Sequence, residues 1–156
     1  MKIVIASDYS GFPLKEAVRR HLAASHEITD VGQTEPGDKL SYVDATVALA
    51  KEIQAGKFSK GILFCGTGAG VSIVANKFKG VYCVPCESVF TAENCAKIND
   101  ANVISMGFNV VGPANAIRIA EAWLPLEFAQ GFDRDRREWL EAGLDKLKKI
   151  EAGNFK

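Results

Sequence analysis

Short apolar runs alternate with amphipathic stretches along most of the chain. The apolar runs are rich in branched residues, as is typical of strands buried in a parallel sheet, and they lie at Lys2–Ser7, Glu27–Gly32, Gly61–Cys65, Val81–Val84 and Asn102–Met106. Between these runs, apolar residues recur every three or four positions, which predicts helices with one buried face. The predicted helices lie around residues 14–22, 42–54, 71–78, 88–98 and 113–125.

The alternation forms five strand–helix units in series, the order from which doubly wound sheets are built. The predicted fold class is α/β: a Rossmann-like, doubly wound sheet of five parallel strands in a single domain, residues 1–156. An extra C-terminal helix is predicted at about residues 133–152, with an apolar stripe made by Trp139, Leu140, Leu144 and Leu147. This helix can pack on its own domain or on a partner subunit, and we expect the partner.

Composition and charge narrow the class of protein. The chain is 47% hydrophobic, and 19 basic residues balance 19 acidic ones, which excludes the basic surface expected of a nucleic-acid binder. No apolar run approaches the roughly 18 residues of a membrane span, and the N-terminus lacks the pattern of a signal peptide. We therefore expect a cytoplasmic protein whose partners are neither nucleic acids nor membranes.

Four cysteines, Cys65, Cys83, Cys86 and Cys95, are expected to be reduced thiols in the cytoplasm. The Cys83-Val-Pro-Cys86 spacing matches thiol oxidoreductases and half of a zinc site. A zinc site needs a second pair of ligands at matching spacing, and none is present, so no metal site is predicted. Either the two cysteines pack as small hydrophobes, or the chain is a thiol-redox protein.

Open parallel sheets bind ligands beyond the carboxyl ends of their strands, which directs attention to the segments Asp8–Gly11, Cys65–Gly70 and Asn99–Asn102. In the second segment, glycines at alternate positions let backbone N–H groups point at a ligand beside the start of a helix. The turn is neither a Walker loop nor a dinucleotide fingerprint. It predicts an anion or oxyanion site, with a tight connection alone as the other interpretation.

Cys65 and Asp8 are the candidate reactive groups at these strand ends. A thiol beside a glycine turn and a helix N-terminus is favoured as the thiolate, so Cys65 is a candidate nucleophile or general base. Both histidines, His21 and His26, lie around the first helix, so proton abstraction is favoured over acyl transfer. An inert cysteine is the alternative, and Asp8 can either bind sugar hydroxyls or cap the first helix.

Four motifs carry a resemblance to a known family: Asp8-x-x-Gly11-Phe12-x-Leu14-Lys15, Cys65-Gly66-Thr67-Gly68-x-Gly70, Ala75-Asn76-Lys77 and Asn99-Asp100-Ala101-Asn102-Val103. From Met1 to about Phe128, the chain closely resembles the B-type ribose-5-phosphate isomerases, a family that includes the galactose-6-phosphate isomerase subunits. The resemblance implies aldose–ketose isomerisation of a small sugar or sugar phosphate without metal or cofactor. It also implies a homodimer or a tetramer whose active sites are shared between subunits.

The resemblance assigns a role to each motif. The residue matching Cys65 moves a proton between C1 and C2 through a cis-enediolate, and the amides of Gly66, Gly68 and Gly70 stabilise the oxyanion. The threonine matching Thr67 assists ring opening. Residues matching Asp8, Tyr42 and Asn99 hold sugar hydroxyls, with Asn99 in the catalytic group.

Departures from the family pattern concern the substrate. Tyr9 and Ile98 stand where the family has histidines, and Asn109 stands where it has an arginine. The C-terminal Gly-Gly-Arg-His of the family reads Gln130-Gly131-Phe132-Asp133 here. Arg136 keeps a phosphate-contacting position, and its neighbours Arg134 and Arg137 are candidate substitutes for the lost arginine. We expect Tyr9 and Asn109, like Arg136, to bind the substrate.

These departures argue against ribose 5-phosphate as the substrate. The loss of a ring-opening histidine suggests an open-chain sugar such as a tetrose phosphate. The loss of arginines suggests instead an unphosphorylated sugar or one with a differently placed anion, since phosphate sites rely on bidentate arginines. The alternative is a non-catalytic carbohydrate-binding or partner subunit of an isomerase complex.

Overall fold

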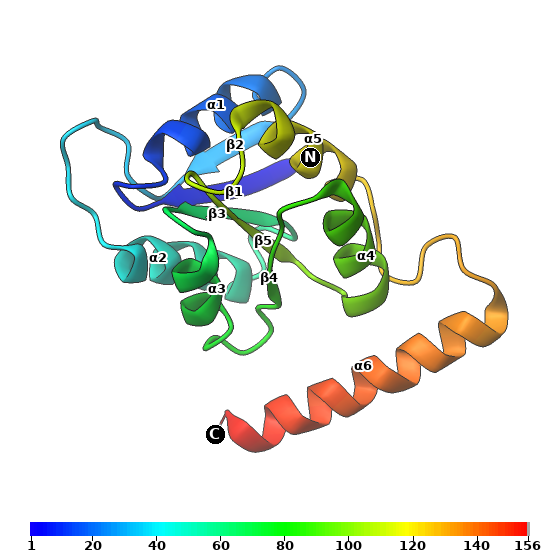
Figure 1. Cartoon of the computed structure of the whole chain (residues 1–156). Coiled ribbons are helices and arrows are strands. Elements are labelled where there is room, and N and C mark those ends of the chain that lie inside the picture. Colours follow the sequence, from blue (N-terminus) through cyan, green and yellow to red (C-terminus); the bar gives the residue numbers. More distant parts are fainter. Residues whose placement is uncertain (156) are drawn as a thin grey trace.

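The computed structural model describes residues 1–155 and contains one parallel sheet between layers of helices (Figure 1). The strands run in the order β2-β1-β3-β5-β4. Their bounds are β1 Lys2–Ser7, β2 Glu27–Asp30, β3 Gly61–Cys65, β4 Cys83–Pro85 and β5 Val103–Gly107. All four pairings are parallel, which confirms the predicted α/β fold class.

Helices cover both faces of the sheet. They are α1 Phe12–Leu22, α2 Tyr42–Gln54, α3 Ala69–Ala75, α4 Val89–Asn99, α5 Pro113–Trp123 and α6 Arg134–Asn154. Side chains of α1, α4 and α5 form one apolar core with the sheet, and side chains of α2 and α3 form the other. The sheet is therefore buried on both faces, which explains why its strands read as continuous apolar runs.

The predicted bounds of β1, β3 and α2 match the structure, β4 and β5 are shifted by one or two residues, and the errors at β2 and α3 have local causes. β2 ends at Asp30 rather than Gly32, because the Asp30 carboxylate accepts the Gly32 N–H at 3.0 Å and turns the chain. α3 begins at Ala69, two residues before the predicted start. Gly68 has φ +80° there, a left-handed conformation that lets the chain enter the helix directly.

The sheet order brings three connections together. β1, β3 and β5 are neighbours, so the loops that follow them meet at the carboxyl edge of the sheet. The absence of a side chain at Gly107 lets the end of β5 approach the loop after β3, since a Cβ at Gly107 would lie 2.4 Å from the carbonyl carbon of Thr67. The loop after β3 is therefore pressed directly against the end of β5.

Helix α6 stands apart from these layers (Figure 1). Leu140 is its one buried residue, and Trp139 remains 64% exposed. Near its C-terminal end, Glu151 accepts hydrogen bonds from the Gly80 N–H at 2.6 Å and the Tyr82 hydroxyl at 3.2 Å. Burial and the Glu151 charge raise the pKa of Tyr82 to about 12. Packing of α6 on a partner subunit stays a prediction.

None of the helices within residues 1–155 combines the length and the apolar character that a bilayer crossing requires.

Candidate active site

Cys65 is the last residue of β3 and is 5% exposed. The Gly68 N–H donates a hydrogen bond to its Sγ at 3.0 Å. The Ser105 hydroxyl donates to the Gly68 carbonyl at 2.8 Å and so fixes the peptide that faces the sulfur. The Cys65 sulfur therefore lies against a fixed backbone N–H at the carboxyl end of β3.

The glycine turn after Cys65 is partly open to solvent: Gly66 and Gly70 are half-buried, and Gly68 is buried. Thr67 is exposed, and its Oγ1 accepts the Ala69 N–H at 3.3 Å. The N–H groups of Gly70 and Val71 lie in the first turn of α3, where a helix offers no internal acceptor. Oriented amides and a thiol thus share one loop, as an oxyanion site requires.

Asp8 follows β1 and is 6% exposed. Its carboxylate accepts the Ser10 hydroxyl at 2.8 Å and 3.0 Å and the Gly11 N–H at 2.8 Å. These bonds hold the chain where it enters α1, so the capping interpretation describes what the carboxylate does within the chain. A carboxylate has about four lone-pair positions, which leaves capacity for a sugar hydroxyl.

Tyr9, Tyr42 and Asn109 surround this loop. The Tyr42 ring packs on the turn, since a Cβ at Gly70 would lie 3.1 Å from its Cδ2. Asn109 is tied to the turn by its N–H, which donates to the Gly66 carbonyl at 3.0 Å. Tyr9 is 61% exposed. Together with Asp8 and Cys65–Gly70, these residues form what we call the carboxyl-edge group.

Asn99 does not join this group, so the expectation that it lies at the same sheet edge is wrong for a single chain. It ends α4, and a crossover helix runs antiparallel to the strands that it connects, so its end lies at the amino edge of the sheet. Arg136 also lies away from Cys65, on α6. A cavity of 210 Å³ between the two helices is lined by Ile98, Asn99, Trp139, Leu140, Gly143, Leu144 and Leu147.

Arg136 is the arginine of this second region whose side chain has no ion pair or hydrogen bond within residues 1–155. Its guanidinium lies 4.5 Å from the Trp139 ring centroid and 5.9 Å from that of Phe132. Arg134 is paired with Glu138 at 2.7 Å, and the Arg137 Nε donates to the Phe132 carbonyl at 3.1 Å. Arg134 and Arg137 are therefore occupied within the chain. We call Lys97, Ile98, Asn99, Phe132, Arg136 and Trp139 the amino-edge group.

The Cys83–Cys86 pair has neither property that a redox site needs. Both thiols are buried. Burial raises the pKa of Cys83 to about 12, and the neighbouring Cys95 thiol together with burial raises the pKa of Cys86. Cys86 Sγ lies 3.9 Å from Cys95 Sγ. The structure favours the packing interpretation and contradicts the thiol-redox alternative.

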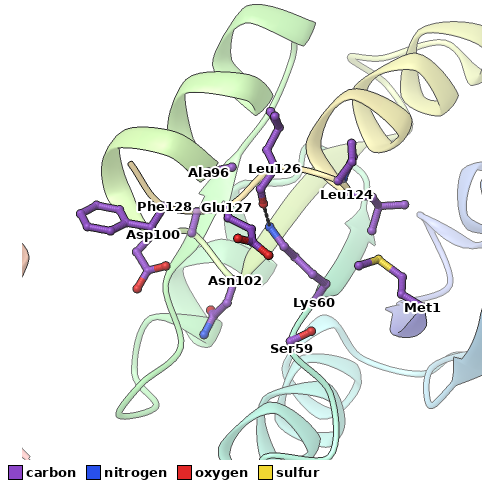
Figure 2. Close-up of a pocket in the computed structure, with 12 residues that line it drawn as sticks. Met1, Ser59, Lys60, Ala96, Asp100, Asn102, Leu124, Leu126, Glu127 and Phe128 are labelled. Carbon is purple, nitrogen blue, oxygen red and sulfur yellow. Dashed lines mark hydrogen bonds between the residues drawn. The ribbon is translucent and has the colours of Figure 1, made fainter. Parts of the chain in front are cut away.

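Figure 2 shows a cavity of 260 Å³ at the amino edge, near Met1 and the loop after α5. Two of its polar side chains are hydrogen-bonded within the fold: Lys60 Nζ donates to the Leu126 carbonyl at 3.0 Å, and the Asn102 amide donates to the Gly80 carbonyl at 2.7 Å. Burial lowers the pKa of Lys60. Within residues 1–155, no group of three or more His, Cys, Asp or Glu side chains could hold a metal ion.

Sequence reasoning missed three polar residues that support the carboxyl-edge group. Ser10 binds Asp8, and Ser105 fixes Gly68. Gln33 is 4% exposed, and its side chain accepts the Leu40 N–H at 3.2 Å and donates to the Glu35 carbonyl at 3.1 Å, which ties together the loop before α2. An isolated serine in the apolar run Val103–Gly107 is the one signal that the sequence offered.

The sequence model of the Ribose/Galactose Isomerase family matches residues 3–140. A protein of Clostridium sp. (strain MSTE9) named 4-deoxy-4-sulfo-D-erythrose isomerase is 41% identical over 157 residues, 100% of this chain and 99% of that protein. D-erythrulose-4-phosphate isomerase 2 of Mycolicibacterium smegmatis is 40% identical over 131 residues, 82% of this chain and 86% of that protein. The solved ribose-5-phosphate isomerase B of Clostridium thermocellum is 32% identical, with a TM-score of 0.88 and 99% of both chains covered.

Proposed function

The chain belongs to the Ribose/Galactose Isomerase family and is an aldose–ketose isomerase, and we propose that its substrate is a four-carbon sugar with a sulfonate at C4, 4-deoxy-4-sulfo-D-erythrose. The observation that carries the proposal is the amino-edge group, where an apolar Ile98 lies in place of a proton donor and where, of Arg134, Arg136 and Arg137, Arg136 alone has no side-chain partner within residues 1–155. A single substrate accounts for both features.

The first feature is the absence of a ring-opening acid. In 4-deoxy-4-sulfo-D-erythrose, C4 carries sulfur in place of its hydroxyl, so no hydroxyl remains there to close a five-membered ring. The sugar is open-chain, and no residue has to protonate a ring oxygen. Ile98 lines the cavity between α4 and α6, and its inability to donate a proton does not slow the isomerisation of an open-chain substrate.

The second feature is the low count of arginines. A sulfonate carries one negative charge, whereas a phosphate monoester carries about −1.5 to −2 at pH 7. A second bidentate arginine is therefore worth more to a phosphate than to a sulfonate. Arg136, whose guanidinium lies near the rings of Phe132 and Trp139, offers one such group.

The carboxyl-edge group supports the chemistry. The Cys65 thiolate removes the proton from C2 of the aldose and returns it to C1, while one hydroxyl proton passes from O2 to O1. The cis-enediolate between these steps carries its negative charge on oxygen, next to the amides of Gly66–Gly70. In this proposal Thr67 and Asp8 hydrogen-bond the sugar hydroxyls, which the exposure of Thr67 and the remaining acceptor capacity of the Asp8 carboxylate support.

The separation of the two groups supports a homodimer with shared sites. Cys65 ends a strand at the carboxyl edge, and Asn99 and Arg136 lie beyond the amino edge of the same chain. A two-fold dimer presents the amino-edge group of one subunit to the carboxyl-edge group of the other, twice. The exposed apolar face of α6 supplies contact surface for it. The four free thiols fit a reducing cytoplasm.

A tetrose 4-phosphate is the second candidate. The Mycolicibacterium relative is named for D-erythrulose 4-phosphate, and a phosphate on O4 blocks ring closure just as sulfur does. The charge of the anion separates the two candidates. A non-catalytic subunit is disfavoured, because Cys65, Thr67 and Asn99 are all present.

The test measures kcat/KM for 4-deoxy-4-sulfo-D-erythrose, D-erythrose 4-phosphate, D-erythrose and ribose 5-phosphate. Exchange of the C1 and C2 protons with solvent deuterium serves as an independent readout, and Cys65→Ala is the inactive control. The proposal expects the sulfonate to have the highest kcat/KM. A higher value for D-erythrose 4-phosphate establishes the second candidate, and a preference for ribose 5-phosphate overturns both.

A further inference from the structure

We propose that Lys97 is a second anion-binding residue, held beside Arg136 by the ring of Phe132, and that this pair binds the sulfonate end of the substrate. The inference rests on the proposed function and adds a residue that the family resemblance does not assign. It also gives a role to Phe132, which stands where the family has an arginine: its ring holds the two cations near each other.

Two cations approach the Phe132 ring. Lys97 Nζ lies 5.3 Å from the ring centroid, and the Arg136 guanidinium lies 5.9 Å from it. Cations within about 6 Å of an aromatic centroid are attracted by the ring quadrupole. The ring therefore offsets part of the repulsion between the two positive groups, and replacing arginine by phenylalanine here leaves a cationic site in place.

Both cations are free to bind a ligand. Within residues 1–155, neither side chain takes part in an ion pair or a hydrogen bond, whereas nearby Arg134 is neutralised by Glu138 at 2.7 Å. Lys97 is half-buried and Arg136 is exposed. Two unneutralised cations that share one ring create a local positive potential, which an anion removes when it binds.

The backbone fixes Lys97 in this place. The Ala129 N–H donates to the Lys97 carbonyl at 2.8 Å, which holds the turn before Phe132 against α4. Asn99 follows Lys97 by two residues, so the expected sugar-binding amide and the proposed anion-binding ammonium come from the same end of α4. The Arg136 guanidinium lies 4.5 Å from the Trp139 ring centroid, and its N–H groups, which have no partner within residues 1–155, can make bidentate contact with an anion.

The kinetic test compares Lys97→Gln with Lys97→Arg, which keeps the charge, and with Lys51→Gln, a control at an exposed lysine of α2. For 4-deoxy-4-sulfo-D-erythrose, Lys97→Gln should raise KM by roughly 10-fold or more, the effect of losing one charge-assisted hydrogen bond, with kcat little changed. Lys97→Arg should restore KM, and KM for uncharged D-erythrose should not move. An unchanged KM in Lys97→Gln, or an equal rise with D-erythrose, overturns the inference.

A binding experiment separates this inference from the proposed function. Propane-1-sulfonate carries the anion without a sugar, and its binding to the full-length protein is followed by NMR titration. We expect wild-type protein and Lys51→Gln to bind it equally, and Lys97→Gln and Phe132→Leu to bind it several-fold more weakly. If no tetrose is isomerised but this pattern holds, the function fails and the anion site stands. If the sulfonated sugar is the best substrate and all variants bind the probe alike, the function stands and the role of Lys97 fails.

Discussion

The carboxyl-edge and amino-edge groups consist of different kinds of chemical group. At the carboxyl edge, backbone amides, glycines and a buried thiol are fixed by hydrogen bonds such as Gly68 N–H to Cys65 Sγ at 3.0 Å. At the amino edge, charged and aromatic side chains of α4 and α6 lie against one another and remain largely exposed. In the proposed site, backbone geometry that tolerates little change thus sets the reacting centre, and side chains that can be exchanged set recognition.

Positions that depart from the family pattern follow this division. Cys65, Thr67 and the three glycines of the turn are retained, whereas Ile98 and Phe132 lie in the amino-edge group. Tyr9 and Asn109 belong to the carboxyl edge but lie at its exposed rim. The residues to which the family resemblance assigns the chemistry are thus retained, whereas the residues that differ from the family pattern are ones expected to affect substrate recognition.

The largest effect is expected from removing the thiol. Cys65→Ala should lower kcat by roughly 10²–10⁴-fold or more, the usual contribution of a positioned base, without loss of the folded state measured by circular dichroism. Full activity in this variant would exclude Cys65 as the base.

The same variant tests whether the two groups meet across a dimer. Asn99→Ala should also be poorly active, yet mixing it with Cys65→Ala under subunit exchange should restore about a quarter of wild-type activity, because half of the dimers then contain one intact site. Mixed samples that exchange subunits and still stay inactive would show that the two groups do not form one site across a dimer.

An intermediate effect is expected at the anion-binding end. Arg136→Gln should lower kcat/KM for the anionic sugar by roughly 10- to 100-fold, mainly through KM, since hydrogen bonds to charged groups contribute about 1.5–3 kcal/mol. D-erythrose, which lacks the anion, is the matched control substrate. Equal losses for both sugars would mean that Arg136 acts on the fold rather than on the anion.

Restoring family residues should change specificity in the opposite direction. Tyr9→His with Asn109→Arg and Phe132→Arg should raise kcat/KM for ribose 5-phosphate, because the variant regains charged donors for a phosphate dianion. Making the first two changes and the third separately shows which sheet edge limits phosphate binding. No gain in any of the three variants would show that these positions do not exclude ribose 5-phosphate.

A small effect is expected from the buried cysteines. Cys83 and Cys86 lie in neither group, so Cys83→Ala and Cys86→Ala should each leave turnover close to that of the wild type. The lost packing should lower the free energy of unfolding by about 1 kcal/mol. Loss of activity as deep as that of Cys65→Ala would restore the thiol-redox interpretation.

No effect is expected from removing metal ions. Oriented amides stabilise the enediolate without a cation, so activity measured after exhaustive treatment with EDTA should equal that of the untreated enzyme. Loss of activity with EDTA and recovery on addition of a divalent ion would contradict the mechanism.

Much of the fold follows from the sequence, because short-range patterns decide it. The run Gly61–Cys65 and the amphipathic stretch Tyr42–Gln54 form the predicted strand and helix with unchanged bounds. The errors, as at Gly32 and Ala69, come from side-chain and backbone turns that act over two or three residues and leave the apolar periodicity intact. The aldose–ketose isomerase activity predicted from the motifs is confirmed by the relatives.

The site itself was only half determined by the sequence. Cys65, Gly68 and Gly70 are close along the chain, so a local motif was enough to group them. Asn99 was grouped with them by motif, but the tertiary structure places it with α6, because a crossover helix ends at the opposite edge of the sheet from the strand that precedes it. Strand order and helix direction depend on contacts between residues far apart in sequence, and the approach of Lys97 and Arg136 to one ring exists only once α4 and α6 have packed.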